Sequence, residues 1–291
     1  MVPVSPVSAP EEEAGDAPLA PGLYIVAGPI GNLQDLSPRA ADWLRRADLI
    51  ACEDTRVTAK LLRAAGSRRP MQSYHEYSGP AVEQALLDRM ASGAVALVSD
   101  AGTPLISDPG FTLVRAARAR GITVTTAPGP CAAIAALSIS GLPSDRFMFA
   151  GFLPPKQAAR RREIANLQGI PATLIFYETG PRLADCLADL AAAMGDRPAA
   201  VARELTKRFE EVVTGSLVEL ADRYAEAPAR GEIVLLIGPP AESAPGDEDA
   251  LDAALTAALA TMPAGKAAAS VAAALGLPRG QVYARALELK K

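Results

Sequence analysis

Short aliphatic runs that end in loops of glycine, proline and small polar residues are the feature that most constrains the fold of this chain. Residues 23–26, 49–52 and 95–98 are three such runs. Segments with a helical spacing of apolar residues separate them, and two of these begin at Ser37-Pro38 and at Pro109. The alternation predicts an α/β domain over residues 22–127 with a mostly parallel sheet.

The alternation of expected strands and helices continues after Pro128-Gly129-Pro130, but the spacing of the elements changes. We expect a second α/β domain over residues 128–240, with a mixed sheet because several connections are short. Its strands are expected at 147–149, 173–177, 199–203 and 232–237, and its helices at 131–140 and 181–194. Residues 241–250 have the composition of an acidic linker, and residues 251–291 are predicted to form a small helical module resembling a helix-turn-helix.

The N-terminal segment carries no targeting signal. Residues 1–21 hold Glu11, Glu12, Glu13 and Asp16 without a basic residue, which predicts a disordered acidic tail. The uncharged run 121–144 is long enough to span a bilayer, but its prolines and glycines favour a buried strand–turn–helix. We expect a cytoplasmic protein that does not associate with a membrane.

Composition excludes several chemistries. Cys52, Cys131 and Cys186 are far apart and lack CxxC spacing, and His75 is the only histidine of the 291 residues. Neither a disulfide framework nor a metal site is therefore expected. A formal net charge of −4 argues against a protein that coats nucleic acid non-specifically.

Three loops that follow strands are candidates for ligand binding: residues 28–31, 99–110 and 128–131. In open α/β sheets ligands bind outside the carboxyl ends of the strands. Ordinary turns are the alternative for each loop, but the loop 99–110 is longer and more polar than a turn needs. The loops lack a GxGxxG fingerprint and a P-loop and hold few cations, so a nucleoside without phosphate, such as S-adenosylmethionine, fits better than a dinucleotide.

Several segments carry a family resemblance. Residues 99–110 (SDAGTPLISDPG), 128–130 with 141–143, 202–207 (ARELTK), 53–56 and 73–76 resemble the tetrapyrrole-methylase superfamily, over residues 22–240 and in order. They are most similar to the branch that methylates ribosomal RNA. The resemblance implies two α/β domains with S-adenosylmethionine in the cleft between them, and a homodimer. It also implies 2′-O-methylation of a cytidine in the decoding region of 16S ribosomal RNA.

Two positions depart from the family pattern. Members that act on small molecules tend to have Gly-Asp-Pro where this chain has Gly102-Thr103-Pro104, which favours the RNA branch. Relatives commonly have serine where this chain has Cys131. If that position contributes a hydroxyl group, cofactor affinity is weaker here; if it contributes a backbone group, nothing changes.

The resemblance implies which residues form the site. Cofactor contacts are expected from Pro29, Asp100, Gly102, Thr103, Pro104, Ile106, Ser107, Gly129, Cys131, Tyr177 and Ala202. Removal of a hydroxyl proton needs a general base, and the catalytic candidates are Asp54, Asp108 and Glu204. Each has a structural alternative: Asp54 as a partner of Arg56, Asp108 as the cap of the helix at Pro109, and Glu204 as a partner of Lys207.

RNA contacts need cations. Candidates are Arg56, Lys60, His75, Lys156, Arg160, Arg161, Arg162 and Lys207. We expect Arg56 and Lys60 on a helix and residues 156–162 in a loop, and a solvated charged face is the alternative. His75 is a candidate base or RNA contact, or a surface residue. The C-terminal module has five basic residues against Glu288, so it is either a further RNA contact or a packing or dimer-stabilising hairpin.

Two other functions remain open from the sequence. One is methylation of a tetrapyrrole or another small molecule with the same fold and cofactor. The other is non-catalytic nucleic-acid binding by the C-terminal module. Thr103 and the basic residues weigh against a small-molecule methyltransferase. The loop 99–110 weighs against a protein that only binds nucleic acid.

Overall fold

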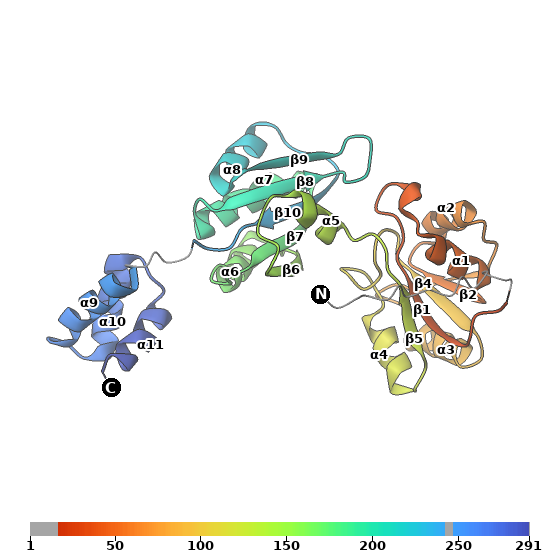
Figure 1. The fold of residues 1–291 in the computed structure, drawn as a ribbon, viewed down its shortest axis with the longest axis horizontal. Coiled ribbons are helices and arrows are strands. Elements are labelled where there is room, and N and C mark those ends of the chain that lie inside the picture. The colour runs from red at the N-terminus through yellow and green to blue at the C-terminus, as the bar shows by residue number, and fades with distance from the viewer. Residues whose placement is uncertain (1–16, 242–246, 291) are drawn as a thin grey trace, which may run out of the picture. The chain divides into compact units, whose positions relative to one another are not determined.

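A computed structural model describes residues 17–241 and 247–290. The chain divides into two compact units, one ending at Pro240 and the other beginning at Ala241. The first unit contains two five-stranded sheets (Figure 1), and the two are described in turn.

The first sheet has the order β3-β2-β4-β1-β5 and is parallel throughout, as the sequence predicts. Its strands are β1 (Gly22–Val26), β2 (Leu49–Cys52), β3 (Met71–Ser73), β4 (Ala94–Val98) and β5 (Val124–Ala127). Both β1 and β4 are buried along their whole length, because helices cover both faces of the sheet. The short strand β3 was not predicted, since three residues carry too little apolar pattern.

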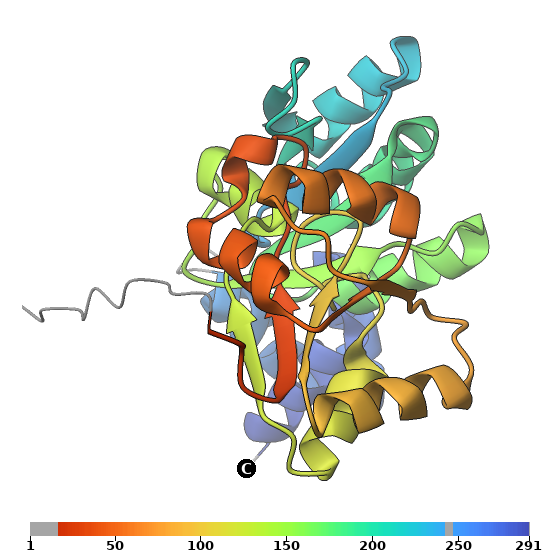
Figure 2. The same cartoon turned by 90° about the vertical axis from the view of Figure 1, so that its right-hand side faces the viewer.

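Four helices form the two covering layers. On one face α1 (Pro38–Arg46) and α2 (Thr55–Ala65) share a core with Tyr24 and Val26. On the other, α3 (Pro80–Met90) and α4 (Phe111–Ala119) pack against Leu23 and Ile25. Figure 2 shows α1 and α2 in red and orange, with α3 and α4 in darker gold and yellow below them. Alternate residues of β1 therefore pack into the cores on opposite faces of the sheet, as strand geometry requires.

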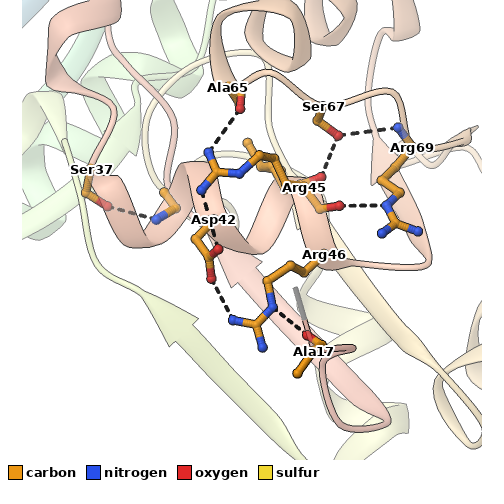
Figure 3. A network of polar contacts seen from close by, with 10 residues as sticks. Ala17, Ser37, Asp42, Arg45, Arg46, Ala65, Ser67 and Arg69 are labelled. Atoms are coloured by element: carbon orange, nitrogen blue, oxygen red, sulfur yellow. Dashed lines mark hydrogen bonds and ion pairs between the residues drawn. The ribbon is translucent and has the colours of Figure 1, made fainter. Parts of the chain in front are cut away.

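A polar network joins α1 to neighbouring segments (Figure 3). The amide of Ala40 donates to the Oγ of Ser37 at 3.1 Å, which caps the helix as Ser37-Pro38 predicts. Arg46 donates through Nε to the carbonyl oxygen of Ala17 at 2.7 Å, and the hydroxyl of Tyr24 donates to Ala20 at 2.9 Å. The prediction of a disordered tail is therefore wrong for residues 17–21, because these bonds order their backbone. The rest of the predicted tail, residues 1–16, lies outside the described residues.

The second sheet has the order β6-β7-β10-β8-β9. Its strands are β6 (Phe147–Phe152), β7 (Thr173–Thr179), β8 (Pro198–Arg203), β9 (Glu211–Ser216) and β10 (Glu232–Ile237). Only the β6–β7 pair is parallel, so the sheet is mixed, as predicted. The edge strand β9 was not predicted, because its charged and polar residues leave it without a buried face.

Helices again cover both faces of this sheet. The helix α5 (Ala132–Ile139) packs on the face that carries Ile175 and Val234. The opposite face is covered by α6 (Gln157–Leu167), α7 (Gly180–Met194) and α8 (Leu217–Glu226). One sequence prediction is wrong here and another is confirmed as a strand–turn–helix. Most of the expected basic loop 156–162 is helical, since it belongs to α6. The uncharged run 121–144 forms β5 and α5, and no described helix is long and apolar enough to cross a membrane.

The second unit consists of α9 (Asp247–Leu259), α10 (Ala264–Leu275) and α11 (Arg279–Glu288). Leu255, Val271 and Val282 are central to a small aliphatic cluster that the three helices share. The turn between α10 and α11 uses Gly276 in a left-handed conformation (φ 66°), where glycine carries no steric penalty. The helix α9 begins inside the predicted linker 241–250, so that linker is shorter than expected.

Candidate functional site

The neighbouring strands β1 and β4 create a crevice at their carboxyl ends. The chain leaves β1 toward α1 on one face and leaves β4 toward α4 on the other, which makes this the switch point where open α/β sheets bind ligands. A pocket of about 320 Å³ opens there. Its wall is made by loop residues of the first sheet (Ile30, Ala101, Gly102, Thr103, Ile106, Ser107, Asp108) and by residues around the second (Ala132, Phe152, Tyr177, Glu178, Thr179, Ala202, Leu205, Glu232, Ile233, Val234).

Hydrogen bonds lock the loop after β4 against its neighbours. The amide of Gly28 donates to Gly102 at 2.8 Å, and the amide of Gly102 donates back to Pro29 at 3.3 Å. The hydroxyl of Thr103 donates to the carbonyl oxygen of Pro130 at 2.9 Å. These bonds bring together the three loops that the sequence singles out. They hold backbone groups around the pocket in fixed positions.

The backbone around the pocket is strained on both sides. Leu105 and Ser107, in the loop after β4, have φ of 74° and 63°. Glu204 and Thr206, in the loop after β8, have φ of 50° and 65°. Left-handed backbone is unfavourable for residues with a side chain, and such conformations cluster at functional sites where the surrounding structure imposes them. In the described residues, these four are the non-glycine residues with positive φ.

Six of the predicted cofactor residues line this pocket: Gly102, Thr103, Ile106, Ser107, Tyr177 and Ala202. Pro29 and Asp100 line an adjacent pocket instead, so the structure does not place them in the predicted cleft. Pro104, Gly129 and Cys131 line neither pocket. A Cβ at Gly129 would approach the Cβ of Ala27 to 2.9 Å, so this position lacks a side chain because two backbone segments pass closely.

Tyr177 is fixed from several sides. Its hydroxyl accepts a hydrogen bond from the amide of Ala133 at 3.3 Å and lies 4.0 Å from the Sγ of Cys131. Phe149 and Phe152 contact the ring edge-to-face, with centroids at 4.8 and 5.7 Å. Burial raises the pKa of the phenol, so Tyr177 is neutral at physiological pH. It offers an apolar ring as part of the pocket wall.

Asp108 is the predicted catalytic residue that the pocket contains. Burial, reinforced by the negative charges of Glu53 and Asp100, raises its pKa from 3.8 to about 6, against a hydrogen bond from Ser99. A carboxyl group with a pKa near the working pH is suited to general-base catalysis. The alternative role as a helix cap is wrong, because α4 begins at Phe111 and Gly110 occupies the cap position.

Asp54 has a structural role in this geometry. It caps α2, where its Oδ1 accepts from the amide of Arg56 at 2.8 Å, and its Oδ2 lies 2.7 Å from the Arg56 guanidinium. These hydrogen bonds lower the pKa of Asp54 to about 2. The side chain lines neither pocket, and such a low pKa makes it a weak base. The catalytic assignment of Asp54 is not supported, and its predicted pairing with Arg56 is confirmed.

Glu204 is likewise held by partners. Its Oε1 accepts from the backbone amide of Glu232 at 3.0 Å and from Nζ of Lys207 at 2.9 Å, and these bonds lower the pKa of Glu204. The same Nζ donates to Glu232 Oε2 at 2.7 Å. Lys207 is therefore placed between two carboxylates, which opposes its predicted role as a phosphate ligand. The predicted Glu204–Lys207 pair is confirmed.

Glu178 is a buried carboxylate at the pocket wall that was not predicted from the sequence. It shares a strand face with Leu174 and Phe176, which belong to the core under α7. Its Oε1 lies 3.1 Å from Arg182, and its Oε2 accepts from the amide of Thr179 at 2.9 Å. Its side chain is therefore directed away from the pocket. A charged residue breaking the apolar run of β7 was the available signal.

The predicted RNA-binding cations fall into two groups. Arg160 is wrong as a surface contact, because its side chain is 4% exposed and is paired with the buried Asp189 at 2.7 Å. Arg161 also pairs with Asp189 at 2.7 Å but remains exposed. The remaining candidates lie on the surface: Arg56 and Lys60 on α2, His75 after β3, Lys156 before α6 and Arg162 on α6.

Comparisons with known proteins bear on both units. A family model described as Tetrapyrrole (Corrin/Porphyrin) Methylases matches residues 22–221, and one described as RsmI C-terminal HTH domain matches residues 244–290. Two curated relatives are named Ribosomal RNA small subunit methyltransferase I. The one from Mesorhizobium japonicum is 50% identical over 277 residues, covering 94% of each chain. The one from Erythrobacter litoralis is 54% identical over 273 residues, covering 94% of this chain and 97% of the relative.

Solved structures share the fold at low identity. Diphthine synthase matches with a TM-score of 0.58 and 16% identity, covering 74% of this chain and 89% of that structure. Uroporphyrin-III C-methyl transferase from Thermus thermophilus, complexed with S-adenyl homocysteine, matches with a TM-score of 0.53 and 19% identity, covering 75% and 97%. These neighbours establish the architecture of the two sheets, and the predicted fold class is confirmed.

Proposed function

This chain belongs to the tetrapyrrole methylase family, and on that premise we propose that it is an S-adenosylmethionine-dependent methyltransferase of 16S ribosomal RNA. The observation that carries the proposal is the identity of 50% and 54% with two ribosomal RNA small subunit methyltransferases along nearly the whole chain. The similarity extends over the C-terminal module, which the RsmI model matches at residues 244–290. In finer terms, the proposed product is a cytidine 2′-O-methylated on its ribose in the decoding region.

The pocket in the first unit suits S-adenosylmethionine chemically. Its wall offers apolar side chains and backbone groups, together with the carboxylates of Asp108 and Glu232. In the part of the chain that the structure describes, no lysine or arginine is among the residues of this wall. Such a wall favours a ligand that carries positive charge and no phosphate, and a sulfonium with an ammonium group meets that description.

The loop after β4 would hold this ligand through its backbone. Gly102 has φ 73°, and a Cβ there would approach Cγ2 of Ile30 to 3.2 Å, so a side chain would crowd the pocket wall. Because its hydrogen bonds fix the loop, its polar groups are preorganised for binding. Tyr177 and Ala202, from the second sheet, would cover the opposite side of the ligand.

Asp108 supplies the acid–base chemistry in this proposal. The cofactor supplies a methyl carbon that a nucleophile can attack in line with the departing sulfur. Asp108, with its pKa near 6, takes the proton that the ribose 2′-hydroxyl loses as its oxygen bonds to that carbon. General-base assistance of this kind contributes about 10²–10⁴-fold, and alignment of the two reactants contributes more.

Exposed cations would hold the RNA backbone. Lys156 and Arg162 flank the buried Arg160 and are open to solvent. In the second unit, Lys266, Arg279 and Lys290 are also exposed. Arg285 is less available, because it pairs with Asp252 at 2.7 Å. Phosphate contacts made by such residues position a nucleic acid without reading its sequence.

A homodimer is part of the proposal. Ile134 and Ile139 on α5 are 48% and 50% exposed, and Phe147 and Met148 on the edge strand β6 are 45% and 38% exposed. Exposed apolar side chains at a free sheet edge invite association with a second copy. A cytoplasmic location follows from the proposed ribosomal substrate.

The proposal is tested by incubating the protein with S-adenosylmethionine labelled in the methyl group and purified 30S subunits. A porphyrinoid precursor serves as the competing substrate, and a chelator is added to one arm. We expect label in 16S RNA, none in the porphyrinoid, and no effect of the chelator. Label in the porphyrinoid alone would establish the small-molecule alternative, and no label in either would leave non-catalytic binding.

A further inference from the structure

A second pocket adjoins the first on the other side of the loop that follows β1. It measures about 520 Å³ and is bounded by that loop, by α2 and by the start of the loop after β4. Ile30, Ala101 and Glu232 belong to the walls of both pockets, so only a thin partition separates them. The proposed methyl transfer needs a second reactant adjacent to the cofactor, and of the residues of this pocket only Lys60 and Lys207 have so far been considered as RNA contacts.

The wall of the second pocket combines apolar surface with positive charge. Leu33 and Val57 are 56% and 37% exposed, which leaves apolar faces open toward a flat ligand. Lys60 lies on α2, one helical turn after Val57, and forms no ion pair with the described residues. Lys207, by contrast, is fixed between Glu204 and Glu232. An unpaired cation beside apolar surface suits a nucleotide, whose base is flat and whose phosphate is anionic.

Asp108 lies close to the wall between the two pockets. It lines the first pocket, and Asp100, whose negative charge raises the pKa of Asp108, lines the second. A hydroxyl group that passes from the second pocket across the shared wall at Ile30 and Ala101 enters the pocket that Asp108 lines. This is the placement required for a base that serves a reaction between ligands held on the two sides.

We propose that the second pocket receives the target nucleotide of the RNA, turned out of its stack. This inference rests on the proposed function and adds to it the place of the substrate. The base lies against Leu33 and Val57, the ribose faces the partition at Ile30 with Asp108 on its far side, and a phosphate contacts Lys60. Enzymes that act on a nucleotide commonly extract it from its stack, because the target atom is otherwise out of reach.

The test fills the pocket or removes its free cation. Val57→Trp places a bulky ring in the second pocket, and Val218→Trp on α8 is the matched control, since Val218 is 45% exposed and far outside the lining. Lys60→Ala removes the cation, and Arg118→Ala on the exposed side of α4 is its control. Methylation of 30S subunits, cofactor affinity by calorimetry and the melting temperature are measured for all four variants and the wild type.

We expect Val57→Trp to lower kcat/KM for 30S subunits by about 10²-fold, because it displaces the ribose from the partition. We expect Lys60→Ala to raise the KM for 30S subunits about tenfold through loss of a charge-assisted contact. Cofactor affinity should stay within about twofold of the wild type, since neither residue touches the first pocket. Both controls should behave as the wild type.

Three results would overturn the inference. Activity of Val57→Trp equal to that of Val218→Trp would show that the pocket holds no reacting group. Loss of cofactor binding in Val57→Trp with an unchanged melting temperature would assign the pocket to the cofactor. A wild type that binds the cofactor but does not methylate 30S subunits would end the proposed function, and with it this inference; the first two results leave that function standing.

Discussion

The hydroxyl of Thr103 donates a 2.9 Å hydrogen bond to the carbonyl oxygen of Pro130 and so joins the loop after β4 to the loop after β5. The two residues are separated by 27 positions in the chain. The bond gives Thr103 a structural role, which is to join these two loops. Small-molecule methylases of this family tend to have aspartate at this position. The bond holds Thr103, which lines the pocket, in a fixed position.

Replacing Thr103 with valine tests the role of this hydrogen bond. Thr103→Val keeps the volume but leaves the Pro130 carbonyl without its donor, at a cost of about 1–3 kcal/mol in the half-buried loop. We expect cofactor affinity to fall by about tenfold, as measured by calorimetry. Thr103→Ser, which keeps the hydroxyl, is the control. Equal affinity in both variants would show that the bond does not shape the pocket.

Replacing Asp108 with asparagine tests the proposed base. Asp108→Asn preserves the size of the side chain but cannot accept the proton, so kcat for RNA methylation should fall by about 10²–10⁴-fold. Cofactor binding, followed by calorimetry, should persist. An Asp108→Asn enzyme with wild-type kcat would exclude this residue as the base.

The pKa of Asp108 also predicts a pH dependence. The acting form is the ionised carboxylate, so wild-type kcat/KM should rise with pH through about 6 and then level off. Because its folded pKa is raised, the folded protein binds this proton more tightly than the unfolded chain does. The stabilisation of the folded protein by this tighter proton binding is fully present at pH values below 3.8, the ordinary pKa of the group. It is lost as the pH rises through about 6, the pKa in the folded protein. Asp108→Asn should therefore have a higher melting temperature than the wild type at pH 7.

Replacement of Asp54 is expected to affect stability and not activity, in contrast to replacement of Asp108. Since Asp54 caps α2 and pairs with Arg56, Asp54→Ala should lower the melting temperature by about 2–4 °C while leaving kcat within a few-fold of the wild type. Asp54→Asn retains a capping oxygen and should recover most of the stability. A kcat loss in Asp54→Asn as large as that in Asp108→Asn would return Asp54 to the catalytic residues.

The basic segment of α6 contains a matched pair of arginines. Arg160→Ala breaks a buried ion pair with Asp189 and should destabilise the protein by about 3 kcal/mol or more, as measured by chemical denaturation. Arg162→Ala should leave stability unchanged but weaken RNA binding and reduce the salt slope by about 0.7–0.9. The same loss of stability in both variants would contradict this division.

Individual elements show which parts of the fold can be predicted from the sequence. The parallel first sheet and the mixed second sheet were predictable, because their central strands are continuous aliphatic runs with clear boundaries. The edge strands β3 and β9 were not, since neither has a buried face that leaves an apolar pattern. The segment 156–162 illustrates a different limit: a run of arginines suggests an exposed loop, but Asp189, which is distant in sequence, buries Arg160.

The same contrast applies to the site. Residues 102, 103 and 106–108 were predictable as pocket residues, because the strand–loop pattern places them at the carboxyl end of β4. The choice among Asp54, Asp108 and Glu204 was not, since each has a neighbour of opposite charge or a helix start nearby in sequence. Only the folded geometry separates the half-buried carboxyl group of Asp108, whose pKa is raised, from two carboxylates that have partners.

The most direct test of the central claim is alkaline hydrolysis of 16S RNA methylated in 30S subunits with labelled S-adenosylmethionine. Cleavage by alkali needs a free 2′-hydroxyl, so a ribose methyl group leaves the modified nucleotide joined to its 3′ neighbour. We expect the label in one alkali-resistant dinucleotide that begins with cytidine, and we expect Asp108→Asn to reduce this label greatly. Label recovered in mononucleotides, as a base methylation would give, or the absence of label from RNA, would contradict ribose 2′-O-methylation by this protein.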